Sequence, residues 1–278
     1  MKLRILFVFY FGLLGGMVLA QEILAELDPK MNETSALLCY GDEFITINDS
    51  GNEAELFFFD TTGTILHTTK ILDAKNVDWE ALATDGSGRV FIGDIGNNKN
   101  DRKSFSIYTI DIDSAKQNNA VSAVQTTFYY PDQSAFPPEK NELYFDAEAM
   151  FYKNDSIFII TKNRTVPFDG IARVYGIAVD GSPKQKAKRY PDLKLSATTW
   201  MEDSVTDAFL KGDSLYVLTY GKVYLFHLTE GFQFEVLKVV EFDAFTQKEG
   251  ISVCNDQLFI TDEKNKFSGK AHLYQLDF

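Results

Sequence analysis

The amino-acid sequence predicts an all-β protein, a β-propeller with five four-stranded blades. Three observations support this fold class. A hairpin-like segment recurs five times, each copy is followed by further strand-like runs, and an unmatched strand-like run precedes the first copy. Sequence repeats of this size indicate stacked or radial architectures. Four-stranded sheets arranged radially form a propeller.

The repeated segment begins at an acidic or small residue, continues through a short apolar run and a polar turn, and ends in a β-branched or aromatic run. Residues 78–94 show the pattern, with Asp85-Gly86-Ser87-Gly88 as the turn. Turn residues between two such runs indicate a β-hairpin. The five predicted hairpins span residues 35–49, 80–94, 148–162, 207–220 and 249–262.

Each hairpin is followed by a run that pairs aliphatic residues with Tyr or Phe, as expected of a strand buried on both faces. These third strands are predicted at residues 56–60, 107–111, 174–177, 223–226 and 273–277. Polar fourth runs suit outer edge strands. They lie at residues 64–72, 121–130, 184–190 and 234–242.

The last repeat has no fourth run before Phe278, whereas residues 21–27 form a strand-like run with no hairpin of their own. We expect this N-terminal strand to complete the last blade and close the ring. The spacing of the repeats leaves room for inserts at 131–141 and 191–203, so six blades are the alternative. No long segment has helical periodicity, and residues 21–278 are expected to be a single domain.

Residues 1–20 have the features of a cleavable signal peptide. Lys2 and Arg4 precede an apolar run that ends at Ala20, and that run is short for a membrane span. A retained anchor is the alternative. Cleavage predicts a secreted or periplasmic protein with no membrane insertion.

The formal net charge of −13 at pH 7 argues against a nucleic-acid partner, because phosphates require clustered basic residues. It equally argues against anionic membrane surfaces. A metal ion or a cationic partner remains compatible. We expect a monomer.

Cys39 and Cys254 are the two cysteines, and they fall at similar places in repeats that should be neighbours. An oxidising compartment would allow them to pair. Equivalent positions in adjacent blades are usually too far apart for a disulfide. Two buried free thiols are therefore the favoured prediction.

The first strand of each propeller blade lines the central channel, so strand starts and the turns after second strands share one face. This geometry predicts an acidic vestibule at the channel mouth. Its predicted members are Asp78, Glu80, Asp94, Asn97, Asn98, Arg102, Asp146, Glu148, Lys162, Arg164, Asp207, Tyr220 and Glu249. The turns at residues 49–52 and 262–263 are expected beside them.

Carboxylates that converge on a small space require cations, protons or basic partners. Arg102, Lys162 and Arg164 are the internal partners, and Ca²⁺ suits the oxygen ligands as an external one. Predicted metal ligands are Glu80, Glu148, Asp207 and Glu249. The alternative is that these acids accept hydrogen bonds from the backbone of the next blade and tie the ring together.

Other chemistries have little support. The three histidines, His67, His227 and His272, fall in or beside predicted outer strands, and neither a nucleophile elbow nor a phosphate-binding glycine loop is present. Zinc lacks paired His or Cys ligands. The segment Asp49-Ser50-Gly51-Asn52 has the composition of a calcium loop but lacks its spacing, and an Asx-turn explains it as well.

The motifs NDSG, DWEALA, GDIGNN, DAEA and EGI occur in this order from residue 48 to residue 251. The series resembles a group of poorly characterised exported bacterial β-propellers, and the resemblance extends from Glu33 to the C-terminus. More distantly, the inner strands are similar to those of phytase-like and lactonase-like propellers, which hold Ca²⁺ at the channel mouth for hydrolysis. The D-D-P-A opening of the phytases is absent.

These observations lead to three functional hypotheses. The first is an exported propeller that binds a ligand, through a divalent cation, at its acidic channel mouth. The second is a Ca²⁺-dependent hydrolase of a phosphoester, lactone or ester. The third is a protein-interaction scaffold, because the fold alone does not select among functions.

Overall fold

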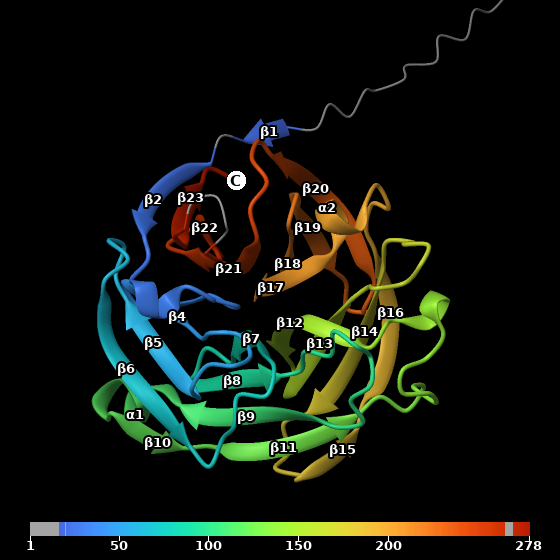
Figure 1. Ribbon diagram of the computed structural model, residues 1–278, viewed down its shortest axis with the longest axis horizontal. Coiled ribbons are helices and arrows are strands. Elements are labelled where there is room, and N and C mark those ends of the chain that lie inside the picture. Colours follow the sequence, from blue (N-terminus) through green and yellow to red (C-terminus); the bar gives the residue numbers. More distant parts are fainter. Residues whose placement is uncertain (1–16, 20, 265–268) are drawn as a thin grey trace, which may run out of the picture.

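The computed structural model describes residues 17–19, 21–264 and 269–278. Five sheets surround a central axis, the four strands of each blade pair antiparallel, and the first strand of each blade lies nearest to that axis (Figure 1). The prediction of five four-stranded blades is confirmed. The two predicted inserts do not form a sixth sheet in the part of the chain that the structure describes.

The strands follow one another from the centre outward in each blade. Blade 1 contains β3 (Leu38–Tyr40), β4 (Glu43–Thr46), β5 (Glu55–Phe59) and β6 (Ile65–Leu72). Blade 2 contains β7 (Trp79–Thr84), β8 (Arg89–Asp94), β9 (Phe105–Asp111) and β11 (Val124–Tyr129). Blade 3 contains β12 (Asp146–Lys153), β13 (Ser156–Lys162), β14 (Ile171–Ala178) and β16 (Lys188–Lys194). Blade 4 contains β17 (Val205–Lys211), β18 (Ser214–Thr219), β19 (Lys222–Leu228) and β20 (Phe234–Phe242).

Blade 5 joins the two ends of the chain. It contains β21 (Lys248–Cys254), β22 (Gln257–Asp262), β23 (His272–Leu276) and the N-terminal β2 (Glu22–Glu26). β2 pairs antiparallel with β23, with Glu22 opposite Gln275 and Glu26 opposite His272. The prediction of an N-terminal closing strand is confirmed.

Two of the predicted fourth strands are each divided in the structure. β10 (Ala120–Ser122) pairs parallel with β6 of the preceding blade, and β15 (Lys184–Lys186) pairs parallel with β11. The chain thus contacts the edge of one blade before it forms the outer strand of the next. These short strands cover backbone groups that an edge strand would otherwise expose.

The predicted signal peptide lies largely outside the described residues. Only Met17–Leu19 of this segment is described, as β1, which pairs parallel with β20 of blade 4. The helices of the described residues are short, such as α1 (Ile112–Gln117) and α2 (Trp200–Asp203), and none is long and apolar enough to cross a bilayer.

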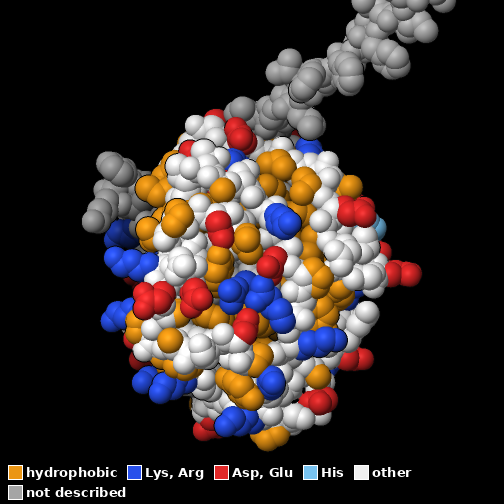
Figure 2. Space-filling model, turned by 90° about the vertical axis from the view of Figure 1, so that its right-hand side faces the viewer, with side chains coloured by type: hydrophobic (Ala, Val, Ile, Leu, Met, Phe, Trp, Pro, Cys, Tyr) orange, Lys and Arg blue, Asp and Glu red, His pale blue; other side chains and the backbone are white. Residues whose placement is uncertain are grey.

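The hydrophobic core lies between neighbouring blades. Phe58 of blade 1 and Trp79 of blade 2, both fully buried, belong to one cluster, while Phe91 and Met150 join blades 2 and 3 in the next. Buried surface of this kind contributes roughly 25 cal/mol per Å². The outer surface in Figure 2 shows acidic and basic side chains interspersed.

Cys39 and Cys254 form a disulfide, so the prediction of two free thiols is wrong. Their Cα atoms lie 5.6 Å apart. The physical reason is that β3 and β21 are innermost strands, and neighbouring blades approach most closely near the axis. The backbone N–H of Cys39 donates to the Oγ of Ser252 at 3.0 Å, which shows how closely these two strands lie.

Candidate functional site

A β-bulge near the start of four inner strands determines the geometry of the channel mouth. The register shifts between Trp79 and Ala81, between Ala147 and Ala149, between Val205 and Asp207, and between Lys248 and Gly250. The inserted residues are Glu80, Glu148, Thr206 and Glu249. Bulges commonly redirect one side chain at a functional site. Three glutamates from three blades thus occupy the equivalent position.

The bulge also explains where Asp207 lies. The sequence alignment placed Asp207 beside the glutamates, but Thr206 has that position in blade 4. Both carboxylate oxygens of Asp207 accept backbone hydrogen bonds, from Ala208 N and Ile251 N at 2.8 Å each. Asp207 thus joins blade 4 to blade 5. This is the alternative role given above for the acids, which is to accept hydrogen bonds from the backbone of the next blade.

Glu80 is buried and has no hydrogen-bond or ion-pair partner among the described residues. Its side chain faces Asp49 and Asp78, and one carboxylate oxygen from each of the three lies within 4.8 Å of the others. Glu80 is 4% exposed. A buried carboxyl normally has a partner, so the Glu80 oxygens are ligands that no group of the described protein satisfies, whereas Asp49 accepts a hydrogen bond from the backbone N–H of Ser50.

Gly96 leaves the space that this acidic triad occupies. A Cβ atom at Gly96 would lie 2.4 Å from Oδ2 of Asp78 and 2.6 Å from Oε1 of Glu80. Any larger residue would displace both carboxylates. The glycine therefore allows the loop after β8 to pass directly beneath them.

A hydrogen-bonded network occupies the opposite side of the mouth. The Lys162 ammonium donates to Oε2 of Glu148 at 2.5 Å and to the Tyr220 hydroxyl at 2.8 Å, and that hydroxyl donates to Oε1 of Glu249 at 2.9 Å. Lys162 is 2% exposed. One buried cation thus links blades 3, 4 and 5.

Two arginines lie at the rim: Arg102 bonds within blade 2, and Arg164 connects blade 3 to blade 2. Arg102 forms an ion pair with Asp94 at 2.8 Å and donates to the Gly96 carbonyl at 2.6 Å. Arg164 donates through Nε to Asp146 and through Nη2 to Asn98.

Asn97 and Asp146 reinforce this connection. The backbone N–H of Asn97 donates to Oδ1 of Asp146 at 2.6 Å, and the Asn97 side chain donates to the carbonyl of Phe145 at 2.8 Å. These bonds hold the loop after β8 of blade 2 against the start of blade 3 at the rim.

We define the vestibule as the channel mouth formed by these groups. Among the residues that the structure describes, it contains eight carboxyls and three basic side chains. The acids are Asp49, Asp78, Glu80, Asp94, Asp146, Glu148, Glu249 and Glu263, and the bases are Arg102, Lys162 and Arg164. The acids outnumber the bases, so several carboxyls must bind a proton or a cation.

The electrostatics agree with this count. Burial raises the pKa of Glu80 well above its usual range, and the charges of Glu148, Asp49 and Asp78 raise it further. Burial and then the charge of Asp49 raise the pKa of Asp78 to about 6. Burial disfavours the Lys162 ammonium, but the charges of Glu148 and Glu249 outweigh this effect and hold its pKa well above the usual value. Carboxyls with perturbed pKa values in a concave site are candidates for function.

Folding stability should fall as pH rises from about 5 to about 9, because vestibule carboxyls bind protons more tightly in the folded chain. Burial raises the pKa of Glu249 to about 8 against the opposing charge of Lys162. Burial and the charge of Asp49 raise that of Glu263 to about 8. The stabilisation is complete below the unfolded-state pKa and is lost as pH rises through the folded-state pKa.

We expect a decrease of about 5 °C in melting temperature over this range in the presence of chelator. Thermal melts in buffers of matched ionic strength would measure it. A Glu249→Gln/Glu263→Gln variant should show a flatter profile. An identical profile for variant and wild type would contradict the prediction.

Asp49, Glu263, Thr206 and Trp200 were not named as site residues from the sequence, although the turns that contain Asp49 and Glu263 were expected beside the vestibule. Asp49 lies in the NDSG motif, which an Asx-turn explained, and Glu263 lies one residue beyond the aligned hairpin of blade 5. Thr206 was missed because the comparison of the repeats matched Asp207, one residue later, with the glutamates. Trp200 lies in an insert with no counterpart in the other repeats, and its ring lies 5.4 Å from the Arg164 guanidinium carbon. Only the first two had a signal in the sequence.

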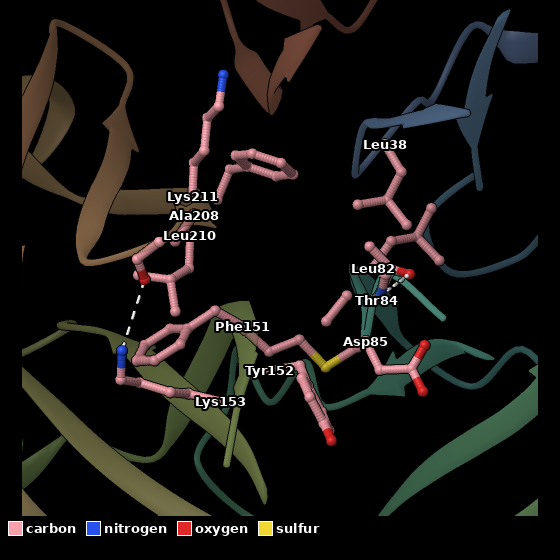
Figure 3. Close-up of a pocket in the computed structure, with 15 residues that line it drawn as sticks. Leu38, Leu82, Thr84, Asp85, Phe151, Tyr152, Lys153, Ala208, Leu210 and Lys211 are labelled. Atoms are coloured by element: carbon pink, nitrogen blue, oxygen red, sulfur yellow. Dashed lines mark hydrogen bonds between the residues drawn. The ribbon is translucent and has the colours of Figure 1, made fainter. Parts of the chain in front are cut away.

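The opposite end of the channel holds a cavity of about 370 Å³ (Figure 3). Its wall is largely apolar, with Leu82, Phe151 and Leu210 among its residues. The Lys153 ammonium at its rim donates to Asp213 at 2.7 Å. No converging set of unpaired polar groups appears among the described residues that line it, and the vestibule remains the stronger candidate.

Comparisons with solved structures identify distant β-propellers. The crystal structure of glutaminyl cyclase from Myxococcus xanthus aligns with a TM-score of 0.56 at 12% identity, over 94% of this chain and 97% of that one. The PQQ-bound aldose sugar dehydrogenase from Streptomyces coelicolor aligns with a TM-score of 0.51 at 9% identity, over 92% and 97%. Identities this low show the fold alone. No family model and no curated protein matches the sequence.

Proposed function

We propose that this protein is an exported β-propeller that binds a divalent cation, Ca²⁺, in the vestibule and uses it to hold a ligand. The observation that carries the proposal is Glu80, a buried carboxyl without a partner that faces Asp49 and Asp78. Hard carboxylate oxygens are the ligands that Ca²⁺ prefers, and it takes six to eight of them. Three carboxylates leave coordination positions for a ligand or for water.

The electrostatic cost of the apo site supports the same proposal. The acids of the triad repel one another, and burial raises the pKa of each of them. A bound cation would remove this repulsion and favour the ionised carboxylates. Export fits the features of residues 1–20 and the resemblance of the motifs to exported propellers.

Calcium binding should stabilise the protein, and removing Glu80 should abolish most of the effect. We expect millimolar Ca²⁺ to raise the melting temperature by about 5 °C over chelator, as for a ligand far above its Kd. Glu80→Gln should weaken Ca²⁺ binding in calorimetry by at least about tenfold. The same variant should leave the apo protein as stable as wild type, because it removes a repelling charge.

The matched control is Glu263→Gln, which neutralises a vestibule carboxyl outside the triad. It should retain Ca²⁺ affinity to within about threefold. Equal loss of affinity in both variants would show that general negative charge, rather than the triad, attracts the ion. Absence of any Ca²⁺ effect in wild type would refute the proposal.

Hydrolysis of a phosphoester, lactone or ester is the second candidate function. The observation that favours it is the hydrogen-bonded chain from Glu148 through Lys162 and Tyr220 to Glu249, beside the proposed cation site. Such a chain can hold or move a proton near a polarised bond. A metal ion at the triad would supply Lewis-acid polarisation there.

Chromogenic phosphate, lactone and ester substrates test this candidate with Ca²⁺ present. If the protein is a hydrolase, Glu148→Gln should reduce kcat by about 100-fold or more. Asp213→Asn, which changes an exposed acid on the opposite face, should leave kcat unchanged. If Glu148→Gln retains wild-type activity, the Glu148 carboxylate does not take part in catalysis.

A further inference from the structure

Arg164 has the donor that best fits a ligand of the vestibule. Its Nε and Nη2 donate to Asp146 and Asn98, and Nη2 also lies 3.5 Å from Glu148, whereas Nη1 has no partner among the described residues. The side chain is 20% exposed. Arg102, by contrast, uses both terminal nitrogens on Gly96 and Asp94. Arginine nitrogens form strong charge-assisted hydrogen bonds with oxyanions.

An aromatic wall lies next to this free donor. The Trp200 ring packs 6.3 Å from that of Tyr220, which in turn lies 6.1 Å from Phe245. Phe245 is 52% exposed, and the indole N–H of Trp200 has no hydrogen-bond partner in the described structure. Flat aromatic side chains beside a few placed polar groups are typical of sites that bind a ring.

The triad and Arg164 belong to one continuous site. Asn98, which accepts from Arg164, follows the loop in which Gly96 lies against Asp78 and Glu80. Charge then restricts the ligand. The vestibule already has more acids than bases, so a dianion such as a phosphate monoester would meet strong repulsion, whereas a monocarboxylate adds only one negative charge.

We propose that the vestibule binds a small organic acid whose single carboxylate is attached to a ring with an apolar face. The carboxylate completes the coordination of the cation at the triad and accepts from Nη1 of Arg164, and the ring packs against Trp200. This inference depends on the proposed cation site. It adds the chemical class of the ligand and gives Arg164 and Trp200 their roles.

Tryptophan fluorescence tests the inference directly. The chain has two tryptophans, and Trp79 is fully buried in the core, so a ligand at the mouth should change the emission of Trp200. The probes are D-glucuronate for a sugar ring and phenylacetate for an aromatic ring, with D-glucose and 2-phenylethanol as their neutral counterparts. With Ca²⁺ present, at least one acid should change the emission while its neutral counterpart does not, and chelator should abolish the change.

Two variants separate the roles of the ligand groups in calorimetry. Arg164→Lys keeps the charge that pairs with Asp146 but loses Nη1, and it should weaken binding of the acid by about tenfold. Trp200→Leu should weaken it by a similar factor. Both should bind Ca²⁺ as wild type does. Arg173→Lys, on the third strand of blade 3 where it pairs with Asp132, is the matched control and should change neither affinity.

The outcomes distinguish this inference from the proposal on which it depends. Normal Ca²⁺ binding with no response to either acid would overturn the inference and leave the cation site intact. Acid binding that persists in chelator, or that is unchanged in Arg164→Lys, would overturn it as well. If the protein does not bind Ca²⁺ in the absence of an organic acid, both the proposed cation site and this inference are refuted.

Discussion

Reduction of the Cys39–Cys254 disulfide should lower the melting temperature by about 10 °C. The bond joins residues 215 positions apart in the chain and connects blade 1 to blade 5. A cross-link over so long a loop restricts the unfolded chain strongly, by about 5 kcal/mol in the loop-entropy description. For a protein of this size, each kcal/mol corresponds to roughly 2–4 °C.

Thermal melts with and without reductant would measure this effect. A Cys39→Ser/Cys254→Ser variant should melt at the temperature of the reduced wild type and should not respond to reductant. This variant separates loss of the bond from other actions of the reductant. A shift below about 3 °C in both comparisons would show that the other ring contacts suffice.

Replacing Lys162 by Met should destabilise the protein by about 3 kcal/mol at neutral pH. The change leaves Glu148 and Glu249 buried near one another without their shared cation, and removal of one member of a buried ion pair costs roughly 3–5 kcal/mol. Protonation of these carboxyls relieves the repulsion, so the loss should be smaller near pH 5. Chemical denaturation at both pH values would measure it.

A double-mutant cycle provides the control. Lys162→Met/Glu148→Gln should recover about 1–3 kcal/mol relative to the single Lys162 variant, since the second change removes an unpaired charge. Lys211→Met, at an exposed pair with Asp256, should cost under about 1 kcal/mol. Equal effects of Lys162→Met and Lys211→Met would mean that the buried network contributes little.

Most of the fold could be predicted from the repeat pattern. Hairpin spacing predicted the ring of five blades, and the unmatched strand near residue 22 predicted its closure. Both follow from local turn chemistry and from the need to cover strand edges. The sequence did not show where the chain passes from one blade to the next. β10 and β15 form by pairing with the outer strand of the preceding blade, and such pairing cannot be read from the local sequence.

The site was predicted in outline, and its details depended on register. Aligning the acids by type placed Asp207 with Glu148, although the bulge assigns that position to Thr206. A one-residue difference of this kind cannot be read from composition, because a bulge is defined only by its partner strand. Trp200 is a second example, since it reaches the vestibule from an insert that no repeat predicts.

The pairing of β2 with β23 has a consequence for the order in which the molecule can be assembled. During synthesis the ribosome releases residues 22–26 long before their partners at 272–276 exist. The fifth blade therefore stays incomplete until the strand at residues 272–276 has been translated. A truncated product that stops after β22 would keep two open sheet edges, which makes it a natural target for proteases and for chaperones that bind exposed strands.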